Sequence, residues 1–180
     1  MADPMRAETV TLKDGRRVNI RPSRLSDAES LLRNVNLVGK EDVYIMLDRG
    51  PNLDEERQWL RTFDGLRRVL LVADSQGETV GSTDCTPGTF AKTYHVGAVG
   101  IAIRDGWRGV GLGRMLMDRI LEWMRARGFK KAELAVFASN DRARRLYESL
   151  GFEDEGIRRR HVLIRGDYVD EILMGMWLQD

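Results

Sequence analysis

The sequence predicts a mixed α/β domain of the α+β kind, in which a mostly antiparallel sheet of about six to seven strands packs with about four helices. Three observations support this prediction. Short apolar segments flank turn signals in the first half of the chain and again at its end. Amphipathic segments with helical spacing lie between them. The strands and helices do not alternate strictly, as they would in a doubly wound fold.

Turn and cap residues predict the elements of the first half. Asp14-Gly15 is a hairpin signal between two short apolar segments. Ser26, followed three residues later by Glu29, has the form of a capping box and predicts a helix that continues through Val35. A second helix is expected over 53–63, because its first turn is acidic and acidic side chains favour a helix N-terminus.

The second half contains longer elements. Apolar residues recur every three or four positions from Leu112 and predict a helix that ends at Gly128. Asn140 is expected to cap a shorter helix that stops at Gly151. A turn at Gly166-Asp167 joins the last two strands. The strands are expected at 9–12, 17–21, 69–73, 79–83, 95–103, 132–136, 162–164 and 168–177.

Composition narrows the class of protein. A chain of 180 residues is long enough for one domain with a real core, expected over 1–180. Lys plus Arg is 29 and Asp plus Glu is 28, so no overall charge attracts nucleic acid or an anionic membrane. The single cysteine permits no internal disulfide. No apolar run approaches the ~20 residues of a membrane span, and residues 1–6 lack an apolar signal region, so we expect a cytoplasmic protein.

The segment 99–113 carries the chemistry. An apolar strand runs into a loop with glycine at 106, 109, 111 and 113, and this loop opens the amphipathic helix. The first turn of a helix has unpaired N–H groups and a partial positive charge, and glycines let a ligand approach the backbone. Arg108 and Arg114 add formal charge at the rim. The pattern predicts a phosphate or pyrophosphate site.

Other interpretations of this loop fit less well. A tight turn without a ligand would not need glycine at four of eight positions. A dinucleotide site needs a third glycine where this chain has Arg114, and a P-loop needs Gly-Lys followed by Ser or Thr, which is absent. What remains is the pattern Arg108-x-x-Gly111-x-Gly113.

This pattern resembles the acyl-CoA loop of the GCN5-related N-acetyltransferase (GNAT) superfamily, Q/R-x-x-G-x-G/A. Asn140 and the run from Leu146 to Phe152, which contains Leu-Tyr-x-x-x-Gly-Phe, are similar to the family's downstream motif. The resemblance covers about 9–178 in element order and is specific over 95–152. It implies the GNAT acyl-CoA N-acyltransferase fold, splayed at the central strands, and acetyl-CoA as cosubstrate without a metal.

The resemblance also implies the cofactor contacts. Main-chain groups of the strand at 101–103 would pair with the pantetheine arm, and a backbone N–H near Ile103 would meet the thioester carbonyl. N–H groups at 110–114 would hold the pyrophosphate, Asn140 would bond the pantetheine, and Arg142 or Arg145 would reach the outer phosphate. The implied cofactor-binding residues are Ile101, Ala102, Ile103, Arg108, Gly109, Val110, Gly111, Leu112, Gly113, Arg114, Asn140, Arg142, Arg145 and Tyr147.

Catalysis would need an acid and a base. The family uses a tyrosine at the position of Tyr147 to protonate the leaving thiolate, although Tyr147 also fits the apolar stripe of its helix. The base is open, because the strand from His95 to Ile103 has no glutamate. His95 suits the task by its pKa range, Glu41 and Asp84 are further candidates for the base or for substrate contact, and a water relay would also serve. Direct attack in a ternary complex is preferred to an acyl-enzyme at Cys85.

The acceptor is expected to be a primary amine on a small molecule, such as an amino acid or a polyamine. Segments 38–54 and 160–168 would line its site. The alternatives are an N-terminal acetyltransferase of a ribosomal or other protein, a non-catalytic acyl-CoA sensor, and an unrelated nucleotide-binding module. By analogy with the family, a homodimer is expected.

Overall fold

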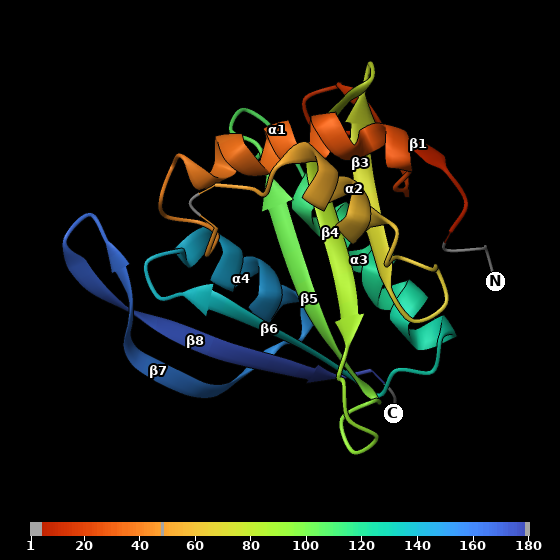
Figure 1. Ribbon diagram of the computed structural model, residues 1–180. Helices are drawn as coiled ribbons and strands as arrows, with labels where there is room; N and C mark the ends of the chain where they lie inside the picture. Colours follow the sequence, from red (N-terminus) through yellow and green to blue (C-terminus); the bar gives the residue numbers. More distant parts are fainter. Residues whose placement is uncertain (1–4, 48, 179–180) are drawn as a thin grey trace.

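In the computed structural model, which describes residues 5–47 and 49–178, eight strands form one sheet in the order β1-β2-β3-β4-β5-β6-β8-β7 (Figure 1). Every neighbouring pair is antiparallel except β5 and β6. The mixed, mostly antiparallel architecture is confirmed. The sheet has eight strands rather than about six to seven, and each of the eight predicted strand ranges overlaps one of them. The strands are β1 Glu8–Thr11, β2 Arg17–Pro22, β3 Val69–Ser75, β4 Glu78–Pro87, β5 Val96–Ile103, β6 Lys131–Phe137, β7 Glu153–Ile164 and β8 Asp167–Trp177.

Four α-helices cover the two faces of the sheet (Figure 1). The helices are α1 Ala28–Gly39, α2 Leu53–Leu60, α3 Leu112–Ala126 and α4 Asp141–Leu150. The apolar run of β3 reflects this double coverage, because successive side chains of a strand point to opposite faces. Leu70 and Val72 pack with α1 and α2, whereas Leu71 belongs to the large core cluster under α3.

Helix ends follow the predicted signals in the second half of the chain. The Asn140 side chain accepts a hydrogen bond from Ala143 N–H at 3.2 Å and so caps α4. Gly151 follows α4 with a φ of 98°, and Gly128 lies beyond α3 with a φ of 79°, a left-handed conformation that glycine adopts without strain. Both predicted helix ends are confirmed.

The predicted cap of α1 is wrong. A short 3-10 turn, Leu25–Asp27, precedes the helix, and Asp27 rather than Ser26 organises its start. The Asp27 carboxylate accepts the Arg24 N–H at 2.7 Å and two hydrogen bonds from the Arg21 guanidinium at 2.7 and 2.9 Å. The buried Arg21 of β2, rather than the predicted Ser26–Glu29 capping box, therefore holds the start of α1. No short-range spacing in the sequence predicts this contact between two elements.

Helix α2 and strand β7 also differ from the predicted bounds. Helix α2 ends at Leu60 rather than at residue 63. Strand β7 begins at Glu153, nine residues earlier than expected, and pairs with β8 through irregular register shifts. Most of β7 is exposed at the edge of the sheet, so it lacks the alternation of apolar residues that marks a half-buried strand.

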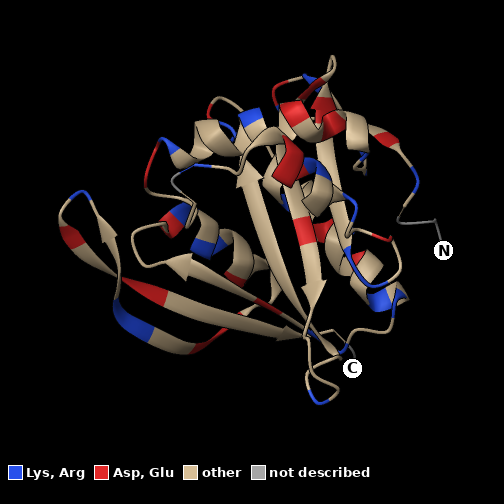
Figure 2. Ribbon diagram, in the orientation of Figure 1, with Lys and Arg blue, Asp and Glu red and all other residues tan. Residues whose placement is uncertain are grey.

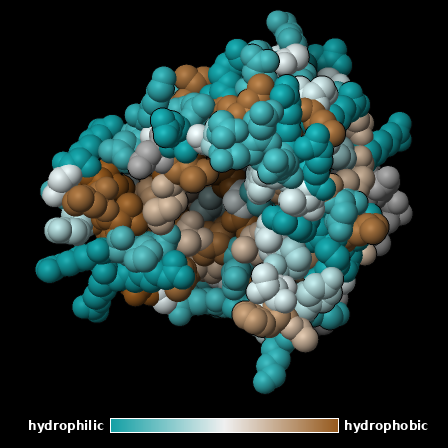
Figure 3. Space-filling model, in the orientation of Figure 1, coloured by the Kyte–Doolittle hydropathy of each residue, from teal (hydrophilic) through white to brown (hydrophobic). Residues whose placement is uncertain are grey.

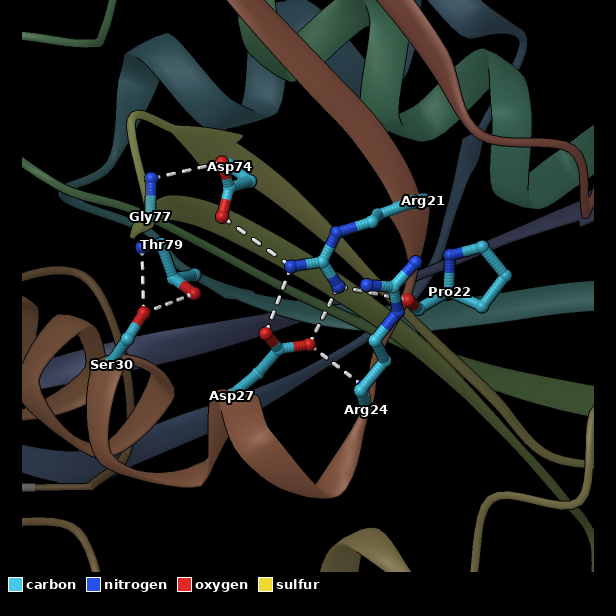
Figure 4. A network of polar contacts seen from close by, with 8 residues as sticks. All are labelled: Arg21, Pro22, Arg24, Asp27, Ser30, Asp74, Gly77 and Thr79. Atoms are coloured by element: carbon cyan, nitrogen blue, oxygen red, sulfur yellow. Dashed lines mark hydrogen bonds and ion pairs between the residues drawn. The ribbon is translucent and has the colours of Figure 1, made fainter.

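The Arg21–Asp27 pair is the centre of a polar network that fixes α1 to the sheet (Figure 4). Asp74, at the end of β3, lies 3.4 Å from the same guanidinium. One turn into α1, the Ser30 hydroxyl oxygen accepts the Thr79 N–H of β4 at 2.7 Å. These contacts hold the helix over the strands that carry the candidate site.

The sheet opens between β5 and β6. These parallel strands pair only from Val96 to Ala98, opposite 131–133. Beyond that point β5 stays paired with β4 as far as Ile103, and β6 stays paired with β8 as far as Phe137. A gap therefore widens between two strands that are each held from the other side, and the predicted splay is confirmed.

Candidate active site

The main chain of β5 faces the gap with alternate residues. His95 O accepts N–H groups from Lys130 and Lys131 on the β6 side, whereas Arg104 N–H donates to Val80 O on the β4 side. Because main-chain direction alternates along a strand, Ile101 and Ile103 direct their N–H and C=O groups into the gap. The N–H and C=O groups of Ile101 and the N–H of Ile103 can pair with an extended ligand that lies beside β5 as an added strand, whereas Ile103 O already accepts a hydrogen bond from Arg108 Nε.

The glycine-rich loop leads from the open end of β5 into α3. Gly109 and Gly111 have φ values of 79° and 94°, and Gly111 is the N-cap of the helix. The first intrahelical bond there joins Met115 N–H to Gly111 O, so the N–H groups before Met115 have no partner within the helix. The start of a helix of 15 residues therefore offers several donors to an anion.

A smaller cavity, of about 360 Å³, lies along this loop and the end of β5. The predicted cofactor residues that line it are Ile101, Ala102, Ile103, Arg108, Gly109, Gly111, Gly113, Arg114, Asn140, Arg142 and Tyr147. Val110 and Leu112 belong to the same turn, although their side chains pack with the core cluster of β1 and β2. Arg145, exposed on α4, lines neither cavity, so the structure favours Arg142 of the two arginines.

Lys13 lines this cavity as well, although no sequence pattern selected it. It belongs to the β1–β2 hairpin turn, where its N–H donates to Val110 O at 3.0 Å. Its side chain lies about 3.6 Å from where a Cβ on Gly111 would be. A cation from the N-terminal hairpin thus borders the candidate anion site.

Arg108 lines the cavity but is already engaged. Its two terminal nitrogens donate to the Glu41 carboxylate at 2.6 and 2.5 Å, and Nε donates to Ile103 O at 2.7 Å. Its guanidinium also lies 4.2 Å from the centre of the Tyr44 ring. Arg108 and Glu41 therefore bind the segment after α1 to the end of β5, and Glu41 lines neither cavity.

A larger cavity, of about 700 Å³, adjoins the first and opens on the face below α1 and α2, where Figure 3 shows a hollow with many apolar side chains. It lies between α1, α2 and the strands β4, β5 and β6. The two cavities share Tyr44, Ile45, Ile101, Ala102, Asn140 and Tyr147. A ligand in one cavity would therefore meet a ligand in the other at these residues.

Tyr147 occupies the junction of the two cavities. It is 5% exposed, and its ring lies 6.0 Å from the ring of Phe152. Burial raises the pKa of Tyr147 to about 12, since the phenolate would lose its hydration. The phenol therefore keeps its proton throughout the neutral range and reaches the junction as a hydrogen-bond donor.

Asp84 lies on β4 in the wall of the larger cavity. It faces Gly100 of β5, where a Cβ would approach Asp84 Oδ1 to 2.6 Å, so the glycine makes room for the carboxylate. Burial raises the pKa of Asp84 to about 6, with the charge of Arg68 acting in the opposite direction. A carboxylate with this pKa is mostly ionised at neutral pH and can accept a proton from an amine.

The structure does not bring His95 together with these residues. It is exposed just before β5, at the end remote from the glycine-rich loop, with its ring near Trp177, and it lines neither cavity. Cys85 is fully buried, and burial raises the pKa of its thiol to about 12. A thiol in that state is a poor nucleophile, which favours direct attack over an acyl-cysteine route.

Glu56 of α2 is a second residue, after Lys13, that sequence reasoning missed. Its side chain lines the larger cavity and the residue is 4% exposed. A signal existed, because Glu56 lies three residues after Leu53 and four before Leu60, on the apolar face of the helix. The acidic first turn of α2 hid it, since acidic residues are ordinary there.

Two further properties concern residues 5–47 and 49–178. Within them no helix has the length and apolar character to cross a membrane. The same residues contain no cluster of three or more His, Cys, Asp or Glu side chains suited to a metal ion.

Known proteins resemble this chain in sequence and in fold. The model of the acetyltransferase (GNAT) family matches residues 41–152. An L-amino acid N-acetyltransferase of Escherichia coli is 32% identical over 108 residues, which are 58% of this chain and 65% of that protein. A ribosomal protein bS18-alanine N-acetyltransferase of Salmonella typhimurium is 38% identical over 76 residues, 42% of this chain and 51% of that protein.

The chain thus spans between half and two thirds of the length of these curated relatives. Among solved structures, an acetyltransferase from Salmonella typhimurium with its cofactor acetyl-CoA superposes with a TM-score of 0.83. That superposition covers 91% of this chain and 95% of the other at 21% identity, so it is a likeness of fold.

Proposed function

The chain belongs to the GNAT family of acetyltransferases, and from this membership we propose that it moves the acetyl group of acetyl-CoA to a primary amine of a small molecule. The observation that supports this most directly is the pair of adjoining cavities that share Tyr147. One runs along the glycine-rich loop and suits a pyrophosphate with a pantetheine arm. The other is a separate space of about 700 Å³ that suits an acceptor.

The smaller cavity fits acetyl-CoA in three respects. Unpaired N–H groups at the start of α3, with Lys13 and Arg142 nearby, suit the phosphates. The main chain of Ile101 and Ile103 suits the amide groups of pantetheine, in the manner of an added strand. Asn140 uses its side-chain oxygen to cap α4, which leaves its amide nitrogen to donate to the same arm.

In direct transfer, Asp84, the main chain of β5 and Tyr147 each have one role. Asp84 accepts the proton that a protonated amine must lose before it attacks the thioester carbonyl. Main-chain N–H groups of β5 that face the gap stabilise the oxyanion that develops on that carbonyl. Tyr147 donates to the sulfur of the leaving thiolate. The amine nitrogen adds to the thioester carbon and gives a tetrahedral intermediate, which loses the C–S bond as the carbonyl re-forms, so no acyl-enzyme is needed. The second proton of the nitrogen leaves to solvent in this step, and Tyr147 regains from solvent the proton that it gives to sulfur.

The test is the release of CoA thiol from acetyl-CoA over a panel of primary amines, with Tyr147→Phe as the variant. We expect the variant to bind CoA with wild-type affinity in a calorimetric titration, because the substitution removes only the hydroxyl and keeps the ring that packs near Phe152. Its kcat should fall roughly 10²–10⁴-fold, the usual contribution of a general acid. Unchanged turnover would exclude Tyr147 from the mechanism, and a wild-type protein that binds no CoA would refute the proposed function.

A protein N-terminus is the second candidate acceptor. It is supported by the 38% identity to the ribosomal protein bS18-alanine N-acetyltransferase over 76 residues. Turnover of an alanyl peptide with a kcat/KM above that of every small amine would favour this candidate. The cytoplasmic location, the single domain and the homodimer stay predictions.

A further inference from the structure

The larger cavity has an unusual distribution of charge. Its charged lining residues among those the structure describes are all acidic, and they are Glu55, Glu56, Asp84 and Glu171. Figure 2 shows acidic positions on α2 and β4 in this region. The rest of the lining is mainly apolar, with Leu31, Val35, Ile45 and Leu70 among its side chains. A ligand that fills this space meets hydrocarbon and carboxylates.

Three of the four carboxylates have a partner or a role. Glu55 accepts the Asn52 N–H at 3.0 Å and completes the cap of α2. Glu171 accepts from Arg158 at 2.7 Å. Asp84 is the base of the proposed function.

Glu56 remains without a partner. The residue is 4% exposed, and its Oε1 is buried with no hydrogen bond to any described residue. Burial raises the pKa of its carboxyl group. A buried carboxylate without a partner is costly, and a ligand that supplies a cation removes that cost. Glu56 is therefore an unused acceptor in the wall of a cavity that already has a base.

We propose that the acceptor is an apolar amine with a second cationic group and no carboxylate, and that Glu56 binds the second cation. This inference rests on the proposed function and names the acceptor class of the same site. The amine that becomes acetylated lies toward Asp84 and Tyr147, the hydrocarbon lies against the aliphatic wall, and the far ammonium or guanidinium meets Glu56.

A free α-amino acid fits this cavity poorly. Its carboxylate would lie among acidic side chains, and no described lining residue is Lys, Arg or His. Like charges in a poorly hydrated space repel, and a desolvated carboxylate needs a cation or several donors. The proposed acceptors therefore differ from the L-amino acids for which the Escherichia coli relative is named.

The test compares matched acceptors in the wild type and in Glu56→Gln, which keeps the shape and removes the charge. The acceptors are putrescine, hexamethylenediamine and octamethylenediamine, each against the monoamine of equal length, and phenethylamine against L-phenylalanine. For the best diamine we expect kcat/KM to exceed that of its monoamine roughly tenfold to hundredfold, as for a hydrogen bond to a charged group. Glu56→Gln should abolish this preference, so that the variant uses a diamine and the monoamine of equal length with similar kcat/KM.

Glu55→Gln is the control, because it changes an acidic neighbour on the same helix that already caps α2. It should keep the diamine preference. Calorimetric titration of the same amines into the CoA complex provides a readout that needs no turnover. Equal use of diamines and monoamines, a preference that survives in Glu56→Gln, or better use of L-phenylalanine than of phenethylamine would each overturn the inference.

The two proposals fail differently. Acetylation of amines without a diamine preference would refute only the acceptor class. Binding of a diamine that depends on Glu56, with no acetyl transfer to any amine, would support the cation site and refute the proposed activity.

Discussion

Asp27, at the start of α1, and the carboxylates Glu56 and Asp84, in the larger cavity, behave in opposite ways. At the start of α1, Asp27 is held by Arg21 and by a main-chain N–H. Burial alone would raise the pKa of Asp27, but these hydrogen bonds outweigh it and the pKa lies below its ordinary value. In the larger cavity, Glu56 and Asp84 lack such donors, and burial raises the pKa of both.

The difference separates a structural carboxylate from one that is available for chemistry. A charge that the protein itself neutralises contributes to folding and has no capacity left for a ligand. A buried charge without a partner lowers the stability of the folded state and persists where function uses it. Partner bonds, rather than burial or residue type, thus distinguish Asp27 from Asp84 and Glu56.

The largest expected effect is on catalysis by Asp84→Asn. The amide keeps the shape of the side chain but cannot accept the proton, so kcat should fall roughly 10²–10⁴-fold. In the wild type, kcat/KM should decline as pH falls through about 6, because protonated Asp84 is inactive as a base. Initial rates of the wild type and of Asp84→Asn, measured from about pH 5 to about pH 9, test both the loss of kcat and the decline in acid.

The variant should lack this acidic limb of the pH profile. If Asp84→Asn retains this decline in acid, another group is responsible for it, and Asp84 is not the catalytic base. Thermal unfolding of the variant provides the control for its fold.

The next largest effect is on stability by Asp27→Ala. Removal of one partner leaves the Arg21 guanidinium buried without its main carboxylate, which costs about 3–5 kcal/mol for such pairs. We expect a loss near the lower end, because Asp74 remains 3.4 Å from Arg21. Urea unfolding at neutral pH measures the loss. Glu29→Ala, at an exposed position of α1, is the matched control and should change stability by less than about 0.5 kcal/mol.

The lowered pKa of Asp27 determines how the stability difference between the wild type and Asp27→Ala changes with pH. The folded-state pKa of Asp27 is below the unfolded value, so its stabilising contribution is complete above the unfolded pKa and is lost as pH falls through the folded pKa. The wild type and Asp27→Ala should therefore converge in stability in acid. An equal difference at all pH values would contradict the role of the ion pair.

Sequence reasoning succeeded where the signal is local. The glycine-rich turn, the Asn140 cap and the helix end at Gly151 depend on residues within a few positions of one another. The splay between β5 and β6 followed from the family resemblance rather than from any residue pattern.

Features built by distant contacts were not predictable. Lys13 reaches the α3 turn because the first hairpin bonds to Val110, nearly a hundred positions away. Asp84 acquires its raised pKa from packing, and Gly100 opposite it provides the space. The Arg108 of the motif is engaged by Glu41 of another segment, so a correct motif gave an incomplete account of the side chain.

The smallest expected effect, and the sharpest comparison with Asp27, is the stability of Glu56→Gln. The folded-state pKa of Glu56 is above the unfolded value, so its contribution is complete below the unfolded pKa and is lost as pH rises through the folded pKa. Glu56→Gln should therefore stabilise the protein at neutral pH, by about 1 kcal/mol or less, and the gain should vanish in acid. Urea unfolding at both pH values measures this. A diamine that saturates the wild type should reverse the sign at neutral pH, because it binds the folded wild type more tightly than the folded variant. Destabilisation of the unliganded variant at neutral pH would mean that the Glu56 carboxylate has a structural role like that of Asp27.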